Sequence, residues 1–195
     1  MTTVYFVRHA ESDITVRDGR SRPLTLKGMT DRHLVTEFLA DKEIDVILSS
    51  PFKRAMDTIS EFAEAKHLPI ITVEDFRERK SDADHLSGNR SDEFWSFIEH
   101  QWADFRFTLS DGECLFVVQQ RNIRALEDTL RQYPNQNLVV GTHGTALSTI
   151  INYYDCSYGY TDFMAMVNIM PWIVKMVFAG TALQSLEKID LFQRA

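Results

Sequence analysis

Three places in the sequence put arginine or histidine side chains where a ligand could bind. Arg8 and His9 come directly after a short run of β-branched and aromatic residues, and Arg54 lies in the first turn of a predicted helix. His143 follows a second apolar run and precedes Gly144, where another helix can begin. Taken singly, an arginine is usually solvated and a lone histidine is usually structural. Gathered in one cleft, such groups would bind an anion, because a cleft focuses the field of the charges that line it.

The elements that must position these residues alternate between strands and helices. We predict strands at residues 3–7, 44–48, 69–73 and 138–141, helices at about 25–40, 50–66 and 113–133, one or two further strands within 165–178, and an edge strand at 182–189. Ser50 and Pro51 read as the N-cap and first residue of the second helix. This order predicts an α/β three-layer sandwich with a mainly parallel central sheet and helices on both faces. Ligands of such sheets bind beyond the carboxyl ends of the strands, so the three places should meet at one edge.

Residues from about 76 to 111 interrupt this alternation. They are rich in charged residues and in aromatic ones, namely Phe94, Trp95, Phe97, Trp102, Phe105 and Phe107. We predict a small, mostly helical cap inserted into a single domain that spans residues 1–195. The aromatic cluster can line a pocket or form the small core of the cap, and the second arrangement is the commoner one.

The composition narrows the classes of partner and compartment. The net charge of −7 argues against a nucleic-acid surface. The most apolar stretch, residues 163–180, is broken by Asn168, Pro171 and Lys175, so no membrane partner is expected. Cys114 and Cys156 lack metal or redox spacing, and the first residues carry no signal-peptide pattern. We therefore expect a cytoplasmic protein with reduced cysteines.

Six motifs in this sequence resemble, in order, those of the phosphatase branch of the histidine phosphatase (phosphoglycerate-mutase-like) superfamily. Between them they cover the chain from residue 4 to about 147. The resemblance is specific because the motifs share an order and a plausible spacing, while any one of them would be a weak signal. The motifs are residues 8–12 (RHAES), 23–25 (PLT) with Gly28, 49–55 (SSPFKRA) with Thr58, 76–78 (FRE), 112–114 (GEC) and 142–144 (THG).

The resemblance implies a role for each of five side chains. His9 would be the nucleophile that forms a phosphohistidine intermediate, and Glu78 would be the general acid and base. Arg8 and Arg54 would clamp the phosphoryl group, and His143 would donate a hydrogen bond to it. No metal or other cofactor is required, because arginines supply the positive charge that phosphoryl transfer needs.

Further substrate contacts are expected around these five residues. Ser12 and Thr15 are candidates, although Thr15 stands where relatives carry asparagine and has a shorter reach. Gly144 begins a helix whose N-terminus favours an anion. A second anionic group of the substrate could be bound by basic residues near Glu78, which otherwise form a solvated surface: Arg77, Arg79, Lys80 and Arg90.

Departures from the mutase pattern favour a phosphatase. Mutases typically continue after the acid with His-Tyr-Gly, whereas this chain continues Arg79-Lys80-Ser81 and lacks a clear counterpart of their paired cap arginines. We therefore expect a phosphohydrolase, a metal-independent phosphatase of the histidine acid type acting on a small phosphorylated metabolite. The alternatives are a phosphoglycerate mutase and a non-catalytic phosphate-binding regulatory module. A homodimer formed through an exposed sheet edge is compatible with the sequence.

Overall fold

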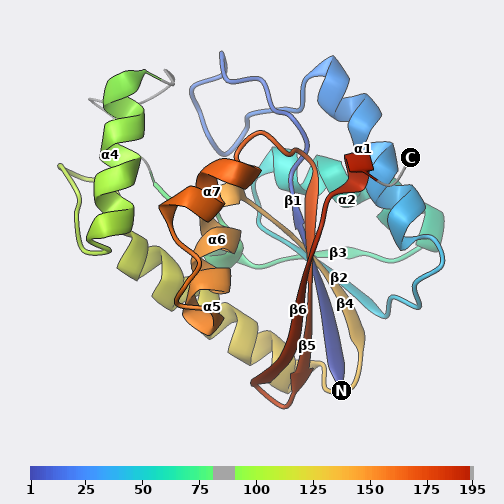
Figure 1. The fold of residues 1–195 in the computed structure, drawn as a ribbon. Coiled ribbons are helices and arrows are strands. Elements are labelled where there is room, and N and C mark those ends of the chain that lie inside the picture. The colour runs from blue at the N-terminus through green and yellow to red at the C-terminus, as the bar shows by residue number, and fades with distance from the viewer. Residues whose placement is uncertain (81–90, 194–195) are drawn as a thin grey trace.

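One six-stranded sheet forms the centre of the protein in the computed structural model, which describes residues 1–80 and 91–193 (Figure 1). The strands follow the order β3-β2-β4-β1-β5-β6 across the sheet. Their bounds are β1 Thr2–Arg8, β2 Val46–Ser49, β3 Ile70–Thr72, β4 Asn137–Thr142, β5 Trp172–Ala179 and β6 Ala182–Ile189. Strands β1 to β4 pair in parallel, while β5 and β6 are antiparallel to their neighbours. The predicted mainly parallel sheet is confirmed.

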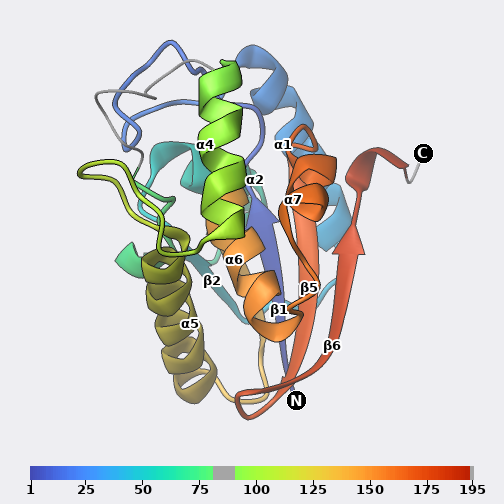
Figure 2. The ribbon, with the colours of Figure 1, turned by 60° about the vertical axis from the view of Figure 1, so that its left-hand side comes forward.

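Helices cover both faces of this sheet, as expected for a three-layer α/β sandwich (Figures 1 and 2). Side chains of α1 and α2 pack on one face, and those of α5, α6 and α7 pack on the other together with α4. The helices of the described residues are α1 Leu26–Leu39, α2 Lys53–Lys66, α4 Asp92–Ala103, α5 Leu115–Gln132, α6 Gly144–Tyr154 and α7 Tyr160–Met166, with 3-10 turns at Glu74–Phe76 and Leu191–Gln193.

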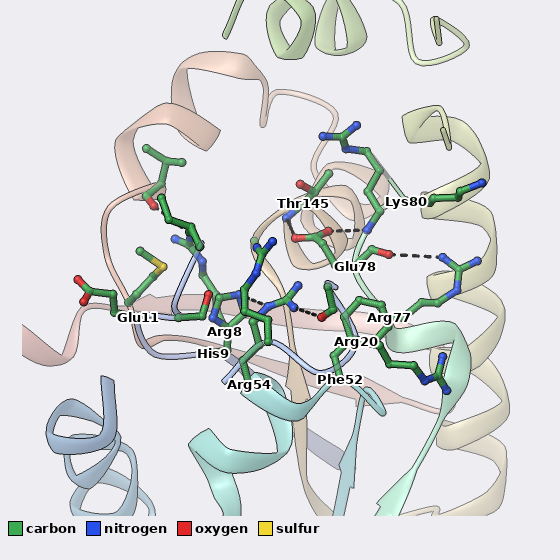
Figure 3. Close-up of a pocket in the computed structure, with 18 of the residues that line it drawn as sticks. Arg8, His9, Glu11, Arg20, Phe52, Arg54, Arg77, Glu78, Lys80 and Thr145 are labelled. Atoms are coloured by element: carbon green, nitrogen blue, oxygen red, sulfur yellow. Dashed lines mark hydrogen bonds between the residues drawn. The ribbon is translucent and has the colours of Figure 1, made fainter. Parts of the chain in front are cut away.

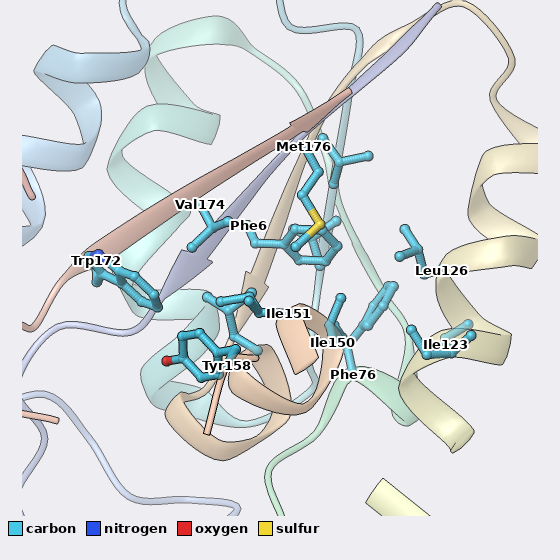
Figure 4. Packing of buried hydrophobic residues seen from close by; sticks show 14 of the residues in the cluster. Phe6, Phe76, Ile123, Leu126, Ile150, Ile151, Tyr158, Trp172, Val174 and Met176 are labelled. Atoms are coloured by element: carbon cyan, nitrogen blue, oxygen red, sulfur yellow. The ribbon is translucent and has the colours of Figure 1, made fainter. Parts of the chain in front are cut away.

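Successive side chains of β1 point into two different hydrophobic cores, one on each face of the sheet. Tyr5 and Val7 face α1 and α2, whereas Val4 and Phe6 face α5 and α6, because successive side chains of a strand point to opposite faces. Figure 4 shows Phe6 within the second, larger core. Of these four strand residues, Tyr5 alone exposes any surface. This packing holds the end of β1, and hence the residues after it, in a rigid frame.

The start of α2 differs from its prediction. The helix begins at Lys53 with Phe52 as its N-cap, so Ser50 and Pro51 precede it. The Ser50 hydroxyl accepts a hydrogen bond from the Phe52 backbone N–H at 3.2 Å and lies 2.8 Å from Nε2 of His143. Ser50 and Pro51 therefore form a tight turn before the helix, and the Ser50 hydroxyl contacts His143, which is distant in the sequence.

The strand expected within residues 165–178 is present as β5, which starts at Trp172, after α7. Phe163 and Met166 of α7 are both buried, three residues apart on one helix face. A short apolar run reads alike as a buried helix or a buried strand, so the sequence alone did not separate the end of α7 from β5.

The predicted cap is present as α4, which stands over the carboxyl edge of the parallel strands (Figures 1 and 2). Its aromatic residues divide between the two roles that the sequence left open. Trp102 packs into the core against Phe163 with ring centroids 5.7 Å apart, whereas Phe94 and Trp95 are half-buried and line a cavity. The remaining part of the predicted insertion, residues 81–90 with Arg90, lies outside the described residues.

The loop after β1 is tied down at its base. Thr25 caps α1 by accepting the Gly28 backbone N–H at 3.0 Å, and its hydroxyl donates to the Glu11 carboxylate at 2.7 Å. A Cβ atom on Gly28 would lie 2.1 Å from the Glu11 carbonyl oxygen, so only glycine fits there. Among the described helices, none has the length and apolar character that a bilayer crossing requires. Cys114 and Cys156 are both free thiols.

Candidate active site

The three places predicted to bind an anion meet at one cavity. Its volume is ≈ 1080 Å³, and it opens at the carboxyl edge of the parallel strands, between the sheet and α4 (Figure 3). His9 follows β1, Arg54 lies in the first turn of α2, and Gly144 begins α6 after β4; all three line the cavity. The meeting follows from the parallel pairing, because the ends of β1, β4 and β2 lie side by side.

His9 is held as a neutral ring with one nitrogen unprotonated. Its Nδ1 lies 2.7 Å from the Ala10 carbonyl oxygen, which can only accept, so Nδ1 carries the proton. Nε2 therefore has the lone pair, and it accepts a hydrogen bond from Nε of Arg54 at 3.0 Å. Burial, followed by the charges of Arg54 and Arg8, holds the pKa of His9 well below its usual value. A neutral, oriented imidazole is the form that can attack phosphorus.

Backbone and hydroxyl contacts fix the position of this ring. The His9 backbone N–H donates to the Thr142 carbonyl at 3.1 Å, which joins the end of β1 to β4. The next N–H, of Ala10, donates to the Thr58 hydroxyl at 2.9 Å, and that hydroxyl donates to the Arg54 carbonyl at 2.7 Å. Thr58 therefore ties the nucleophile loop to the helix that carries Arg54, which accounts for its place in the sequence motif.

Arg54 is buried and remains a cation. Besides the contact to His9, its Nη1 donates to the Gly19 carbonyl at 2.5 Å, and the guanidinium lies 5.2 Å from the centre of the Phe52 ring. Burial lowers the pKa of Arg54 to about 10, against the opposing charge of Glu78. At neutral pH the group is still charged, and its donors lie beside the histidine lone pair where a phosphoryl group would sit.

Arg8 lies beneath the site with its terminal nitrogens turned towards α7. Nη1 donates to the carbonyls of Met166 and Ile169 at 2.7 and 3.0 Å, and Nη2 donates to that of Val167 at 2.9 Å. A Cβ atom on Gly144 would approach Nε of Arg8 to 3.2 Å, so glycine lets the guanidinium pass close below the start of α6. The charge of Arg8 acts on His9, while direct clamping of a phosphoryl group by Arg8 stays a prediction.

His143 is fully buried next to His9. Its ring packs edge-on against His9 with centroids 5.3 Å apart, and Nε2 contacts the Ser50 hydroxyl at 2.8 Å. Nδ1 has no hydrogen-bond partner among the described residues. Burial and then the charge of Arg54 hold the pKa of His143 well below its usual value. A neutral ring retains one N–H. His143 is not among the residues that line the cavity, so donation of this N–H to a phosphoryl group stays a prediction.

Glu78 caps the N-terminus of α6 with its carboxylate. Oε1 accepts the backbone N–H groups of Arg79 and Ala146 at 2.8 and 3.1 Å, and Oε2 accepts that of Thr145 at 3.1 Å (Figure 3). These three backbone donors fix the position of the carboxyl group at the start of α6. Glu78 lines the cavity, so it is placed to exchange a proton with a bound ligand.

A buried network on α5 holds the segment that carries Glu78. Arg121 donates to the backbone carbonyls of Arg77 and Glu78 at 2.7 and 3.1 Å, and to both oxygens of Glu113 at 3.1 Å. Glu113 also accepts two hydrogen bonds from Arg77 at 2.6 and 2.8 Å. Burial raises the pKa of Glu113, but the hydrogen bonds of Arg77 and Arg121 outweigh it and bring that pKa to about 2. Arg77, expected to bind substrate, thus lines the cavity as the partner of Glu113.

Replacing Arg121 by methionine is expected to lower kcat by about 10- to 100-fold, because the backbone at Glu78 loses its anchor. The loss should be larger for alkyl phosphates than for 4-nitrophenyl phosphate, whose leaving group needs no proton. Steady-state kinetics on both esters, with the melting temperature recorded, measures this. Arg124→Met, an exposed position on the same helix, is the matched control. Equal losses on both esters would show that Arg121 supports only the fold.

Of the other predicted substrate contacts, two lie at the cavity and one does not. Ser12 and Gly144 line the cavity. Thr15 is exposed, is not among the lining residues, and donates its hydroxyl to the Asp13 carboxylate at 2.6 Å. The structure therefore does not bring Thr15 to the site, since the short hydroxyl is used within its own loop.

Sequence reasoning missed a basic loop on the cavity wall. Arg17, Arg20 and Arg22 line the cavity, although none of them was among the predicted substrate contacts. Arg20 pairs with Glu74 at 2.8 Å, and Nε of Arg22 donates to the Val16 carbonyl at 2.9 Å. Three arginines within six residues were the available signal.

Lowering the pH from 7 to 5 is expected to destabilise the fold, because His9 and His143 are buried as neutral rings. Their folded pKa values lie well below the unfolded value of 6.5, so the unfolded chain binds protons that the folded chain does not. Stability that is present above pH 6.5 is then lost as the pH falls, by about 1.4 kcal/mol per pH unit for each ring. Urea unfolding at pH 7, 6 and 5 measures this slope.

Two variants check the origin of that slope. His9→Asn should make it shallower by removing one of the rings. His33→Gln should make it steeper, because the hydrogen bond of Glu61 raises the pKa of His33 and lets that exposed ring stabilise the fold at low pH. A free energy of unfolding that does not fall between pH 7 and 5 would contradict the burial of neutral histidines.

Known proteins resemble this chain in sequence and in fold. A family model described as histidine phosphatase superfamily (branch 1) matches residues 4–165. Phosphoserine phosphatase 1 of Hydrogenobacter thermophilus is 32% identical over 157 residues, covering 73% of this chain and 71% of that protein. The uncharacterized phosphatase PhoE of Bacillus subtilis (strain 168) is 28% identical over 157 residues, covering 77% and 76%. Among solved structures, Bacillus stearothermophilus YhfR shares the fold with a TM-score of 0.74 at 20% identity, covering 94% of this chain and 95% of that one.

Proposed function

The chain belongs to the histidine phosphatase superfamily, and we propose that it hydrolyses small phosphomonoesters through a phosphohistidine formed on His9. The observation that carries the proposal is the state of the His9 ring. Its Nδ1 proton is held by the Ala10 carbonyl, and its Nε2 lone pair is directed to Arg54 at 3.0 Å in the cavity. A nucleophile and a cationic clamp thus share one point where phosphorus can be attacked.

In the first step, Nε2 of His9 forms a bond to phosphorus while the bond to the leaving oxygen breaks. Arg54 transfers its hydrogen bond from the imidazole to a phosphoryl oxygen, and His143 donates its N–H to another. Glu78 gives a proton to the leaving oxygen, so the product departs as an alcohol. Glu78 lines the same cavity as His9, which supports it in this role.

In the second step, water attacks phosphorus and the bond to Nε2 breaks. Glu78, now a carboxylate, accepts a proton from the attacking water, so inorganic phosphate leaves and His9 returns to its neutral form. The proposal needs no metal, since the positive charge comes from Arg54 and Arg8 and from the N-terminus of α6.

A phosphatase accounts for the site better than a mutase does. A mutase has to bind a second anionic group of a bisphosphorylated intermediate. Two of the cations on the cap side are paired within the protein, Arg77 with Glu113 at 2.6 Å and Lys80 with Asp111 at 2.8 Å. Each would have to give up an ion pair to serve a second phosphate.

The experiment that tests this function is phosphate release from a panel of small phosphomonoesters in EDTA, with 3-phosphoglycerate included. Release that persists in EDTA and depends on His9 supports a metal-independent phosphatase. Interconversion of 3- and 2-phosphoglycerate stimulated by bisphosphoglycerate would establish the mutase instead. Binding of phosphate without release from any ester would establish a non-catalytic module.

The proposal also covers the compartment, the partners and the oligomeric state of the protein. We place it in the cytoplasm, on a phosphorylated metabolite, with neither nucleic acid nor membrane as a partner. The net charge of −7 supports the exclusion of nucleic acid. A homodimer through the β6 edge also belongs to the proposal, since β6 pairs with β5 on one side and most of its residues are exposed.

A further inference from the structure

The cavity reaches far beyond the phosphoryl end at His9. Its volume of ≈ 1080 Å³ is at the upper end of the range for sites that enclose a whole small molecule. The space above the phosphoryl position is bounded by α4 and by α7 with the chain that follows it. This part of the cavity has to accommodate the alcohol portion of the ester.

The wall formed by these segments is apolar. Ile98, Phe163 and Val167 line it and are at most 6% exposed. Three further residues of the wall are half-buried, with surface turned to the cavity: Phe94, Trp95 and Met170. Phe94 and Trp95 stack edge-on at 4.9 Å, and the contact of Trp102 with Phe163 joins α4 to α7. The cap therefore presents a preformed aromatic surface to a ligand.

The charges around the cavity balance one phosphate. Among the described residues, eight cationic side chains and six carboxylates line it, a surplus of two positive charges in a protein of net charge −7. A phosphomonoester carries roughly 1.5 to 2 negative charges at pH 7. Arg20 and Arg77 are already paired with Glu74 and Glu113, which line the same cavity. These two arginines would have to give up an ion pair to bind a second anionic group of the substrate.

We propose that the substrate is a phosphomonoester whose alcohol carries an uncharged aromatic or comparably bulky apolar group. The phosphoryl group lies at His9 and Arg54, and the apolar group packs against Trp95 and its neighbours on α4 and α7. This inference rests on the proposed phosphatase function and narrows its substrate class. It disfavours esters that carry a carboxylate next to the phosphate.

The test compares kcat/KM for esters of primary alcohols with similar leaving groups. These are ethyl phosphate, 2-phenylethyl phosphate and 2-(4-carboxyphenyl)ethyl phosphate, with 3-phosphoglycerate as the carboxylated metabolite. We expect 2-phenylethyl phosphate to exceed ethyl phosphate by about 10- to 100-fold, the gain for burying a ring-sized apolar surface. The para-carboxylate should remove most of that gain, because its charge would be desolvated against the wall. Equal values for the first two esters, or higher values for the carboxylated ones, would overturn the inference.

A pair of variants locates the effect on the cap. Trp95→Ala should lower the ratio of kcat/KM between 2-phenylethyl and ethyl phosphate by about 10-fold. Glu99→Ala, an exposed position on the same helix that does not line the cavity, is the matched control and should leave the ratio unchanged. An unchanged ratio in Trp95→Ala would show that the ring binds elsewhere.

Binding to the His9→Ala protein separates this inference from the function on which it rests. Calorimetry with 2-phenylethyl and ethyl phosphate measures preference without turnover. If the wild-type protein releases no phosphate, the phosphatase proposal fails, while the ratio of the two dissociation constants still decides the ligand class. If release is observed but the two esters bind equally, the substrate class is wrong and the phosphatase stands.

Discussion

His9→Ala is expected to lower kcat for phosphate release by about 10⁴-fold or more, the scale seen when a covalent nucleophile is removed. Alanine leaves no atom to accept the phosphoryl group, and the remaining cations can only bind the ester. The measurement is phosphate release in EDTA by wild-type and variant proteins, with the folded state of each checked by melting temperature. The effect should appear in kcat rather than KM, because Arg54 and His143 remain in place.

A second readout identifies the bond that forms on His9. Wild-type protein mixed with labelled substrate and quenched in alkali should retain label in an acid-labile, alkali-stable form, and His9→Ala should retain none. His33→Ala, an exposed histidine on α1, is the matched control and should keep both label and activity. Equal release by the wild-type and His9→Ala proteins would show that His9 is not the nucleophile.

Arg54→Met is expected to lower kcat by about 100- to 1000-fold, the range for loss of one charge-stabilising donor at a reacting oxygen. Arg54 is the buried cation that contacts the nucleophile, at 3.0 Å from its Nε2. Arg54→Lys should recover only part of the rate, because an ammonium keeps the charge but lacks the planar fork of donors. Steady-state kinetics, with inhibition by inorganic phosphate as a measure of anion binding, follows both variants.

The same substitution should change the pH dependence in a known direction. The charge of Arg54 lowers the pKa of His9, so its removal lets that pKa rise towards the ordinary value. The acid limb of kcat/KM, where protonated His9 is inactive, should therefore move to higher pH in Arg54→Met. Lys53→Met alters the neighbouring exposed residue, which pairs with Asp57 at 2.8 Å, and is the control for both effects. A loss of less than about 10-fold with an unmoved acid limb would remove Arg54 from the mechanism.

Much of the fold follows from local patterns that the sequence carries by itself. Runs such as residues 3–7 and 138–141 are apolar on both sides, which is typical of strands buried between two layers of helices. The helices predicted at about 25–40 and 50–66 are present as α1 and α2, with Thr25 as the N-cap of α1. Parallel strands then bring Arg8, His9 and His143 to one edge, so the candidate nucleophile and its surroundings could be predicted.

Other features depend on contacts between residues that are distant in the chain. Arg77 and Glu113 are separated by 36 positions, and Arg121 reaches the backbone of Glu78 across 43. Nothing in the local sequence distinguishes a cation that pairs with such a partner from one that binds substrate. The same holds for Ser50. Its local sequence is typical of an N-cap, but its hydroxyl contacts Nε2 of His143, 93 residues away.

By itself, the sequence determined the layered sheet, the edge at which ligands bind and the chemical types gathered there, because periodicity and strand direction are local properties of the chain. Only the tertiary structure decided which cations are neutralised, that Thr15 is turned away, and that an aromatic wall of α4 and α7 faces the phosphoryl site. The physical reason is that charge and apolar surface act through space. Their effect on a ligand depends on which partners folding brings within a few ångströms.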